Sequence, residues 1–306
     1  MFFSFCRWLL VAGSLKTGCF FYQPVTSIQK PVYFAKNSIL LPQPPYTKPI
    51  GLPFVELQSV DSTNNYARKQ IHAGLAQHGM AIFTHEQLSG KGQRGKSWSS
   101  EKDANIILSI VIKPQPLLLT QQFLLSACVA VAIHDFFIKY AGPDTKIKWP
   151  NDLYWQDRKA GGILIESIVG SQESGVGSWE WAIVGIGINI NQTAFPDHLP
   201  NPVSLKQITG KNFDPVELAK ELCELLNKNF EELVNDGFEK TYAAYLADLY
   251  KINSTVKFKK DNRVFEAIIK SVSPSGKLIV HPDSYRDIEE DPISIGFDFG
   301  EVEWVI

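Results

Sequence analysis

Hydrophobic positions change their spacing several times along the chain, and these changes predict alternating strands and helices from residue 53 onward. Short apolar or β-branched runs predict strands at residues 54–57, 79–84, 105–112, 161–169 and 181–191. Helical spacing predicts helices over residues 62–74, 121–140, 215–237 and 238–250. Short strands then follow tight turns at residues 255–259, 264–272, 277–280 and 301–306. This order predicts an α+β (or α/β) core over residues 53–251 and a small β-barrel over residues 252–306.

Residues 1–52 differ from the rest of the chain because they contain no Asp or Glu and several prolines. Their first apolar stretch is too short and interrupted to span a membrane. We interpret them as a disordered or artefactual extension, with an organelle-targeting peptide as the alternative. The expected location of the protein is therefore the cytoplasm.

Charge and cysteine content narrow the class of protein. The formal net charge of −2 gives no support for a nucleic-acid partner. None of the four cysteines is in a Cys-x-x-Cys pair or at a metal-ligand spacing. Buried, reduced thiols in an ordinary globular protein are the expectation.

Residues 89–98, Ser-Gly-Lys-Gly-Gln-Arg-Gly-Lys-Ser-Trp, combine three glycines with three cations. Glycine allows backbone N–H groups to approach a ligand closely, and Lys and Arg donate to carboxylate or phosphate oxygens. Residues 90–95 also match the G-x-G-x-x-G spacing of dinucleotide-binding folds, but residues 97–101 do not continue as the amphipathic helix that those folds require. We therefore predict an anion-binding loop between strands. A plain surface turn and a dinucleotide oxidoreductase are the disfavoured alternatives.

A second motif is Lys-Trp-Pro-Asn-Asp at residues 148–152. Lys148, Asn151 and the carboxylate of Asp152 suit the positioning of Mg²⁺ and a triphosphate. An Asn-Asp turn beside a partly buried Trp explains the same residues equally well.

Lys159 forms a third motif with Gly161 and Gly162, which open a predicted strand. The glycines permit close approach of a ligand, and the lysine can bridge a carboxylate and a phosphate. A solvated lysine before a β-bulge is the alternative.

The fourth motif, residues 185–191, places Gly185 and Gly187 on one strand before Asn189. The glycines leave room for something flat on one strand face, and the Asn amide can bind an adenine or ribose. A helix packed on a glycine-lined strand is the alternative.

Taken in this order, the motifs resemble those of biotin protein ligases, which are also called biotin–acetyl-CoA-carboxylase ligases. The matching residues include 61–64 and 86–87, and the resemblance covers residues 54–306. It implies a mixed sheet flanked by helices, related to class II aminoacyl-tRNA synthetases, with an SH3-like C-terminal domain. It also implies an AMP-forming reaction in two steps. Biotin and Mg·ATP give biotinyl-5′-AMP, and a lysine of a biotin carboxyl carrier domain then accepts the biotin.

The resemblance also assigns roles to residues. It implies catalytic roles for Lys91, Arg94 and Lys159, and a Mg²⁺ ligand in Asp152. It implies a biotin site formed by Ser62, Thr63, Asn64, Gln87, Gly90, Lys91, Gly92, Lys159, Gly161 and Gly162. It implies an ATP site formed by Gln93, Arg94, Trp98, Lys148, Asn151, Gly187 and Asn189. Residues 193–205, which are rich in proline, are the expected loop over the adenylate.

The glycine loop departs from the family pattern at two positions, because Lys91 and Gln93 stand where arginine is usual. Arginine at the second position matters in the family for retaining the reactive adenylate. Our hypothesis is that Lys91, Arg94 or Lys96 supplies the missing charge.

Competing functions within this fold are a lipoate–protein ligase and a non-catalytic nucleotide- or biotin-binding protein. The expected partners are biotin, ATP and a carrier domain, with no tightly bound cofactor and no membrane. Residues 1–52 lack the helical periodicity of a helix-turn-helix, so we predict a monofunctional ligase that binds no nucleic acid. A monomer or a homodimer is the expected assembly.

Overall fold

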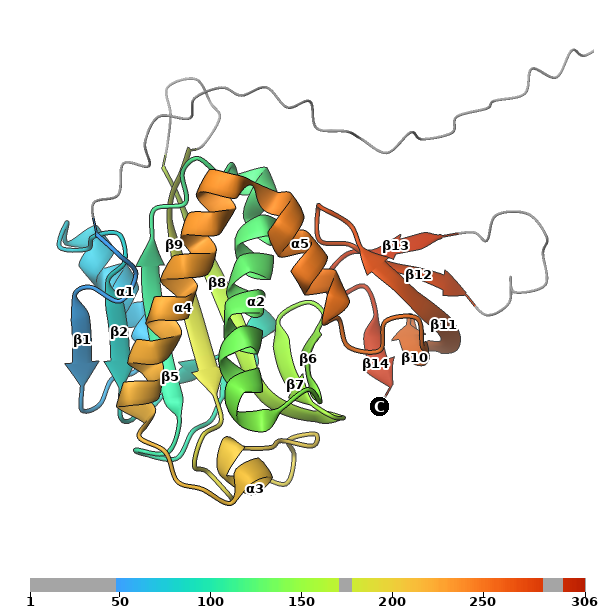
Figure 1. Cartoon of the computed structure of the whole chain (residues 1–306), viewed down its shortest axis with the longest axis horizontal. Coiled ribbons are helices and arrows are strands. Elements are labelled where there is room, and N and C mark those ends of the chain that lie inside the picture. Colours follow the sequence, from blue (N-terminus) through green and yellow to red (C-terminus); the bar gives the residue numbers. More distant parts are fainter. Residues whose placement is uncertain (1–47, 171–177, 283–293, 306) are drawn as a thin grey trace, which may run out of the picture. The chain divides into compact units, whose positions relative to one another are not determined.

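The computed structural model of the chain describes residues 48–170, 178–282 and 294–305. Its largest sheet has seven strands: β1 (Phe54–Leu57), β2 (Ala81–Thr84), β5 (Ile106–Ile112), β6 (Thr145–Lys148), β7 (Asp152–Trp155), β8 (Arg158–Gly170) and β9 (Ser178–Ile188). Their order is β1-β2-β5-β9-β8-β7-β6 (Figure 1). Only β1 and β2 are paired in parallel. The sheet is therefore mixed, as predicted.

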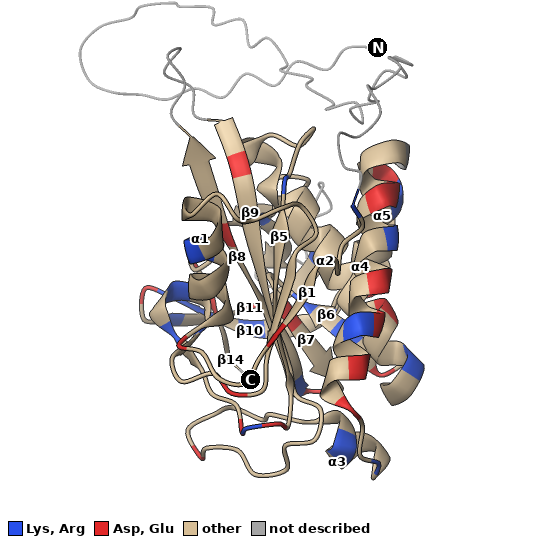
Figure 2. Ribbon diagram, turned by 90° about the vertical axis from the view of Figure 1, so that its left-hand side faces the viewer, with Lys and Arg blue, Asp and Glu red and all other residues tan. Residues whose placement is uncertain are grey.

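Helices cover both faces of this sheet (Figure 2). They are α1 (Thr63–His72), α2 (Gln122–Ala141), α3 (Leu205–Thr209), α4 (Pro215–Asp236) and α5 (Phe238–Ala247). On one face, Ala67 of α1 packs with Ile82 and Ile183 of the sheet. On the other face, α2 and α4 contribute to the larger hydrophobic core. The predicted arrangement of a sheet flanked by helices is confirmed.

The α2 helix is apolar around most of its circumference, as its sequence predicted. It is long and apolar enough to cross a membrane. Its side chains are nevertheless enclosed by the fold, and Leu125, Phe136 and Phe137 are fully buried. The α2 helix is therefore the central helix of the core.

The C-terminal module is a second, antiparallel sheet of five strands. These are β10 (Thr255–Lys260), β11 (Arg263–Val272), β12 (Leu278–Pro282), β13 (Ile295–Phe297) and β14 (Glu303–Val305), in the order β13-β12-β11-β10-β14. The sequence did not predict β13, because three residues that include Gly296 carry little strand signal. Side chains point alternately inward and outward along β11 and β12, and the inward side chains of Ile269 and Val280 are buried.

The N-terminal edge of the fold differs from the predicted one. Ile50 is only 4% exposed and its N–H donates to Asn227 Oδ1 at 2.8 Å, so the fold includes residues that we assigned to the extension. The boundary at residue 52 is therefore too late. Residues 1–47 lie outside the described part, and our interpretation of them stays a prediction. The predicted boundary at residue 251 between the core and the C-terminal module stays a prediction.

The cysteine prediction is confirmed where it can be examined. Cys128 and Cys223 are buried free thiols, and burial raises the pKa of each to about 12. Both therefore stay protonated near neutral pH, whereas Cys6 and Cys19 lie outside the described residues.

Candidate active site

Gly162 of β8 and Gly185 and Gly187 of β9 form a row without side chains on the sheet face that α1 covers, and we call this row the glycine strip. Gly162 and Gly187 are direct cross-strand neighbours, and Gly185 lies two residues along β9 on the same face. A Cβ at Gly185 would lie 2.6 Å from Asn64 Oδ1, and one at Gly187 would lie 2.5 Å from the Trp98 ring. Side chains from α1 and from the glycine loop therefore occupy the space that the missing Cβ atoms leave.

The Lys159 ammonium and the Asp152 carboxylate lie beside Gly162, farther along this strip. Lys159 Nζ is 2.6 Å from Asp152 Oδ1, and the two side chains are 32% and 22% exposed. A Cβ at Gly162 would lie 3.4 Å from this carboxylate and 3.5 Å from the ammonium. Antiparallel pairing of β7 with β8 places Asp152 opposite Gly162, which explains why the motifs at 148–152 and 159–162 meet.

A buried polar network lies at the opposite end of the strip. The Ser109 hydroxyl lies 2.7 Å from Thr63 Oγ1 and 2.6 Å from Asn64 Oδ1. Asn64 Nδ2 donates to Glu166 Oε2 at 2.7 Å. Thr63 N donates to Gln87 Oε1 at 2.9 Å. The predicted biotin residues Thr63, Asn64 and Gln87 are thus brought together at the start of α1.

This network contains three residues that our sequence reasoning missed. Ser109 is the one polar residue of β5, Glu166 lies with Ser167 between apolar residues of β8, and Arg68 Nη2 binds Glu166 Oε1 at 2.9 Å. A hydroxyl or carboxylate within an apolar strand needs a buried hydrogen-bond partner, so the sequence alone could have pointed to Ser109 and Glu166.

The Gln87 side chain takes the place of the N-cap side chain at the start of α1. Ser62 is the N-cap residue of α1 and is buried, but its side chain makes no capping hydrogen bond. The Gln87 carboxamide accepts from Thr63 N instead and satisfies one of the free donors at the helix start. Gly90 makes this possible, because a Cβ there would lie 2.5 Å from Gln87 Nε2 and 2.2 Å from Trp98 O.

The predicted anion loop is a short hairpin rather than an irregular loop. It consists of β3 (Gly90–Lys91), a 3₁₀ turn (Gln93–Gly95) and β4 (Ser97–Trp98), with Gly92 N donating to Lys96 O at 2.7 Å. We call residues 90–98 the glycine hairpin. Pairing of Gly90 with Trp98 directs the chain so that the indole ring covers Gly187.

Side chains of the glycine hairpin contact three different elements. Lys91 Nζ donates to Asn65 Oδ1 of α1 at 2.6 Å. Gln93 Nε2 donates to Ile163 O of β8 at 3.5 Å. Arg94 Nη1 donates to Gly300 O of the C-terminal module at 2.9 Å. The predicted catalytic cations Lys91 and Arg94 therefore have protein partners in this structure.

Lys148 and Asn151 are both buried. Lys148 Nζ donates to Tyr154 Oη at 3.1 Å and lies 4.9 Å from the centroid of the Trp304 ring. Burial lowers the pKa of Lys148 to about 8. Asn151 Nδ2 donates to Ile163 O and so links the turn between β6 and β7 to β8. The structure thus gives Asn151 a local structural role, and its ATP contact stays a prediction.

Asn189 fixes the expected adenylate loop beside Lys159. Its Nδ2 atom donates to Val203 O at 3.1 Å and to Lys159 O at 3.4 Å. Lys159 N donates to Asn201 O, and Val203 N donates to Lys159 O. The far end of the loop is therefore anchored, and Asn189 can bind a nucleotide through Nδ2 only by exchanging these carbonyls.

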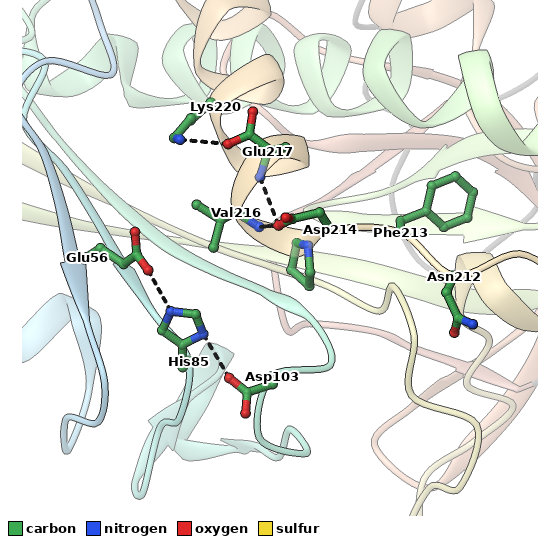
Figure 3. Close-up of a pocket in the computed structure, with 10 residues that line it drawn as sticks. Glu56, His85, Asp103, Asn212, Phe213, Asp214, Val216, Glu217 and Lys220 are labelled. Atoms are coloured by element: carbon green, nitrogen blue, oxygen red, sulfur yellow. Dashed lines mark hydrogen bonds and ion pairs between the residues drawn. The ribbon is translucent and has the colours of Figure 1, made fainter.

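One open pocket of about 660 Å³ lies at the start of α4 and has none of the predicted site residues in its lining (Figure 3). His85 there bridges Glu56 and Asp103, with a nitrogen–oxygen distance of 2.8 Å to each. Asp214 and Glu217 add two further carboxylates. This excess of negative charge opposes binding of ATP or a carboxylate, so the strip and not this pocket is the candidate active site.

The donor set limits how a metal ion can be held. Within residues 48–170, 178–282 and 294–305, no group of three or more His, Cys, Asp or Glu side chains is arranged to hold one. A single carboxylate, such as that of Asp152, suits Mg²⁺ only together with substrate phosphates and water.

Comparisons with known proteins show which family the chain is similar to. Residues 56–189 match the model of the biotin/lipoate A/B protein ligase family. A biotin–acetyl-CoA-carboxylase ligase of Paracoccus denitrificans is 30% identical over 241 residues, which are 76% of this chain and 95% of that protein. The bifunctional ligase/repressor BirA of Bacillus spizizenii is 28% identical over 244 residues, which are 78% of this chain and 73% of that protein.

The fold is also found in a solved structure. A biotin protein ligase from Aquifex aeolicus, in complex with biotin and ATP, superposes with a TM-score of 0.66 at 20% identity. The match covers 82% of this chain and 98% of that one. The predicted fold class is therefore confirmed.

Proposed function

Because the chain belongs to the biotin protein ligases of the biotin/lipoate A/B protein ligase family, we propose that it activates biotin with ATP and transfers it to a lysine of a carrier domain. The observation that carries this proposal is the row of side chains over the glycine strip. Asn64 and its polar network lie at one end, Trp98 lies over Gly187, and the Lys159–Asp152 pair lies beside Gly162. One face of the sheet thus offers a polar end, an aromatic plane and a charged end.

The polar end favours biotin over lipoate as the substrate. The ureido ring of biotin has both donors and acceptors, which suit the Thr63, Asn64 and Gln87 side chains. The dithiolane ring of lipoate has no strong donor or acceptor, so it cannot exchange hydrogen bonds with these side chains as the ureido ring can.

The charged end suits the first reaction step. The biotin carboxylate attacks the α-phosphorus of ATP, a P–O bond forms, and the bond to pyrophosphate breaks. Two anions must approach each other, so the Lys159 ammonium neutralises their charge and stabilises the charge that develops on phosphorus. Asp152 would hold Mg²⁺, which would supply further neutralisation of the phosphates.

The second step consumes the mixed anhydride. The amine of the carrier lysine attacks the biotinyl carbonyl carbon, an amide bond forms, and AMP leaves. Trp98 and the loop at residues 193–205 would exclude water and so reduce hydrolysis of the adenylate. The expected acceptor is a biotin carboxyl carrier domain, and the name of the Paracoccus relative gives acetyl-CoA carboxylase as the acceptor of that protein.

Two further parts of the proposal concern assembly and DNA. We propose a monofunctional ligase that binds no operator, although the Bacillus relative is named as a repressor too. We also propose that the protein is a monomer or homodimer and that it is located in the cytoplasm. Specific DNA binding by the full chain would overturn its monofunctional part.

Pyrophosphate exchange into ATP tests the proposal directly. With purified protein, biotin should support exchange and lipoate should not. Exchange with lipoate alone would reverse the substrate assignment, and no exchange with either would favour a binding protein without catalysis. Transfer of labelled biotin to a purified carrier domain tests the second step.

A further inference from the structure

The turn at residues 298–301 of the C-terminal module is held rigidly by charged side chains. Glu301 N donates to Asp298 O at 3.1 Å, and Asp298 N donates to Glu301 Oε2 at 2.7 Å. Lys277 Nζ binds Asp298 Oδ2 at 2.5 Å, and Lys260 Nζ lies 3.7 Å from Glu301 Oε1. These contacts fix the orientation of the two residues between them, Phe299 and Gly300.

The side chain of Arg94 contacts both Phe299 and Gly300. The Gly300 carbonyl accepts from Arg94 Nη1 at 2.9 Å, and Arg94 Cζ lies 5.9 Å from the centroid of the Phe299 ring. Gly300 has φ of +86°, and a Cβ there would lie 1.9 Å from Arg94 Nη1. Glycine is thus needed both for the backbone conformation and for the space that the guanidinium occupies.

Arg94 itself adopts an uncommon backbone conformation. Its φ and ψ of 54° and 41° lie in the left-handed region, which costs free energy for a residue with a Cβ. This conformation at the tip of the glycine hairpin directs Arg94 toward the C-terminal module. The contacts with Phe299 and Gly300 offset that cost.

The Phe299 ring also contacts the second motif of the core. It meets the Trp149 ring edge to face, with 6.1 Å between centroids, and Trp149 Nε1 donates to Gly276 O at 2.9 Å. The turn therefore lies between the tip of the glycine hairpin and the Lys-Trp-Pro-Asn-Asp segment, and Phe299 contacts both.

We propose that Phe299 and Gly300 are positioning residues for the glycine hairpin, and that they act through Arg94. The hairpin is held by α1 through Lys91 and by β8 through Gln93, and the turn of the C-terminal module provides the third attachment. Loosening this attachment lets the hairpin open and speeds the loss of biotinyl-AMP. This inference rests on the proposed ligase function.

Hydrogen exchange tests the attachment without using activity. In Phe299→Ala, amides of residues 90–98 should exchange about threefold to tenfold faster than in the wild type, as expected when the cation–π contact with Arg94 is lost. Amides of α1 should be unchanged. Val264→Ala is the matched control, because Val264 is an exposed apolar residue of the same module. Unchanged exchange in the hairpin of Phe299→Ala overturns the proposal.

A double-mutant cycle tests whether the effect passes through Arg94. Phe299→Ala and Gly300→Ala should each speed dissociation of biotinyl-AMP by about threefold to tenfold, and Phe299→Tyr should restore the wild-type rate. In an Arg94→Gln background, Phe299→Ala should have no further effect. A full additional effect there would show that Phe299 acts through Trp149 instead. If the wild type forms no biotinyl-AMP, the ligase function fails, whereas the exchange experiment still judges the attachment.

Discussion

Lys159 Nζ lies 2.6 Å from Asp152 Oδ1 beside Gly162, and this ion pair holds the lysine at the charged end of the glycine strip. Lys159→Ala should lower kcat/KM for biotin-dependent pyrophosphate exchange by about 100- to 1,000-fold, because a charge aimed at the transition state is lost. Lys146→Ala is the control, since Lys146 forms a comparable ion pair with Asp248 at 2.8 Å elsewhere on the sheet. Equal activity of the two variants would contradict the role of Lys159.

Gly187→Ala should displace the Trp98 ring, which forms the aromatic plane of the proposed site. The new Cβ would lie 2.5 Å from the Trp98 ring, so the indole has to move. We expect kcat/KM for ATP to fall by about ten- to a hundredfold, as misplacement of a binding group usually causes. Ile186→Val changes a buried residue on the opposite face of β9 and should have little effect. Wild-type kinetics in Gly187→Ala would show that Trp98 does not form part of the nucleotide site.

Ser109→Ala should weaken both stability and biotin binding. Its hydroxyl is fully buried and lies within hydrogen-bond distance of Thr63 and Asn64, which the substitution leaves with one partner fewer. We expect the free energy of unfolding to fall by about 1–3 kcal/mol and KM for biotin to rise. Ser99→Ala, at an exposed position, is the control. Urea unfolding and exchange kinetics measure the two effects, and loss of stability with unchanged KM would limit Ser109 to a structural role.

His85 should make stability depend on pH. Hydrogen bonds to Glu56 and Asp103 raise its pKa above the ordinary value of 6.5, because only the imidazolium can donate to both carboxylates. The stabilisation is complete below the unfolded pKa of about 6.5 and is lost as the pH rises through the raised pKa of the folded state. The difference in unfolding free energy between wild type and His85→Gln should therefore shrink as the pH rises above about 6.5. A pH-independent difference would contradict this assignment.

Gln93→Arg tests the hypothesis that another cation compensates for Gln93. The structure attaches Lys91 to Asn65 and Arg94 to Gly300, which leaves these two cations less suited to that task. We therefore expect Gln93→Arg to slow dissociation of biotinyl-AMP by about tenfold or more, as an added charge-assisted hydrogen bond would do. Gln93→Asn, which keeps the amide and adds no charge, is the control variant. Little change with arginine would support compensation by Lys91, Arg94 or Lys96.

The sequence predicted local elements well because each has its own periodic signal. The start of α4 is an example, since helical spacing predicted a helix from residue 215, and Asp214 before it accepts from Val216 N and Glu217 N. The meeting of Asp152 with Lys159 depends on the antiparallel pairing of β7 with β8, which places Asp152 opposite Gly162 and Tyr154 opposite Lys159.

What covers each strand could not be predicted in the same way. Alternation showed that Gly185 and Gly187 leave one face bare, but Asn64 and Trp98 reach it from distant parts of the chain. Asn151 and Asn189 looked like ligand-binding amides, whereas tertiary contacts give their nitrogens main-chain carbonyls. Amide side chains suit both tasks equally, so only the fold decides between them.

The glycine strip separates the scaffold of the site from the groups that give it selectivity. Gly162, Gly185 and Gly187 hold their places through main-chain pairing, while the groups over them come from α1, the glycine hairpin, and Asp152 and Lys159 of β7 and β8. Asn64 and Trp98 therefore do not contribute to the strand ladder on which they rest. A library that varies Trp98, which lies outside that ladder, should yield folded proteins with altered preference for the nucleotide, and this makes the strip a starting point for engineering new ligases.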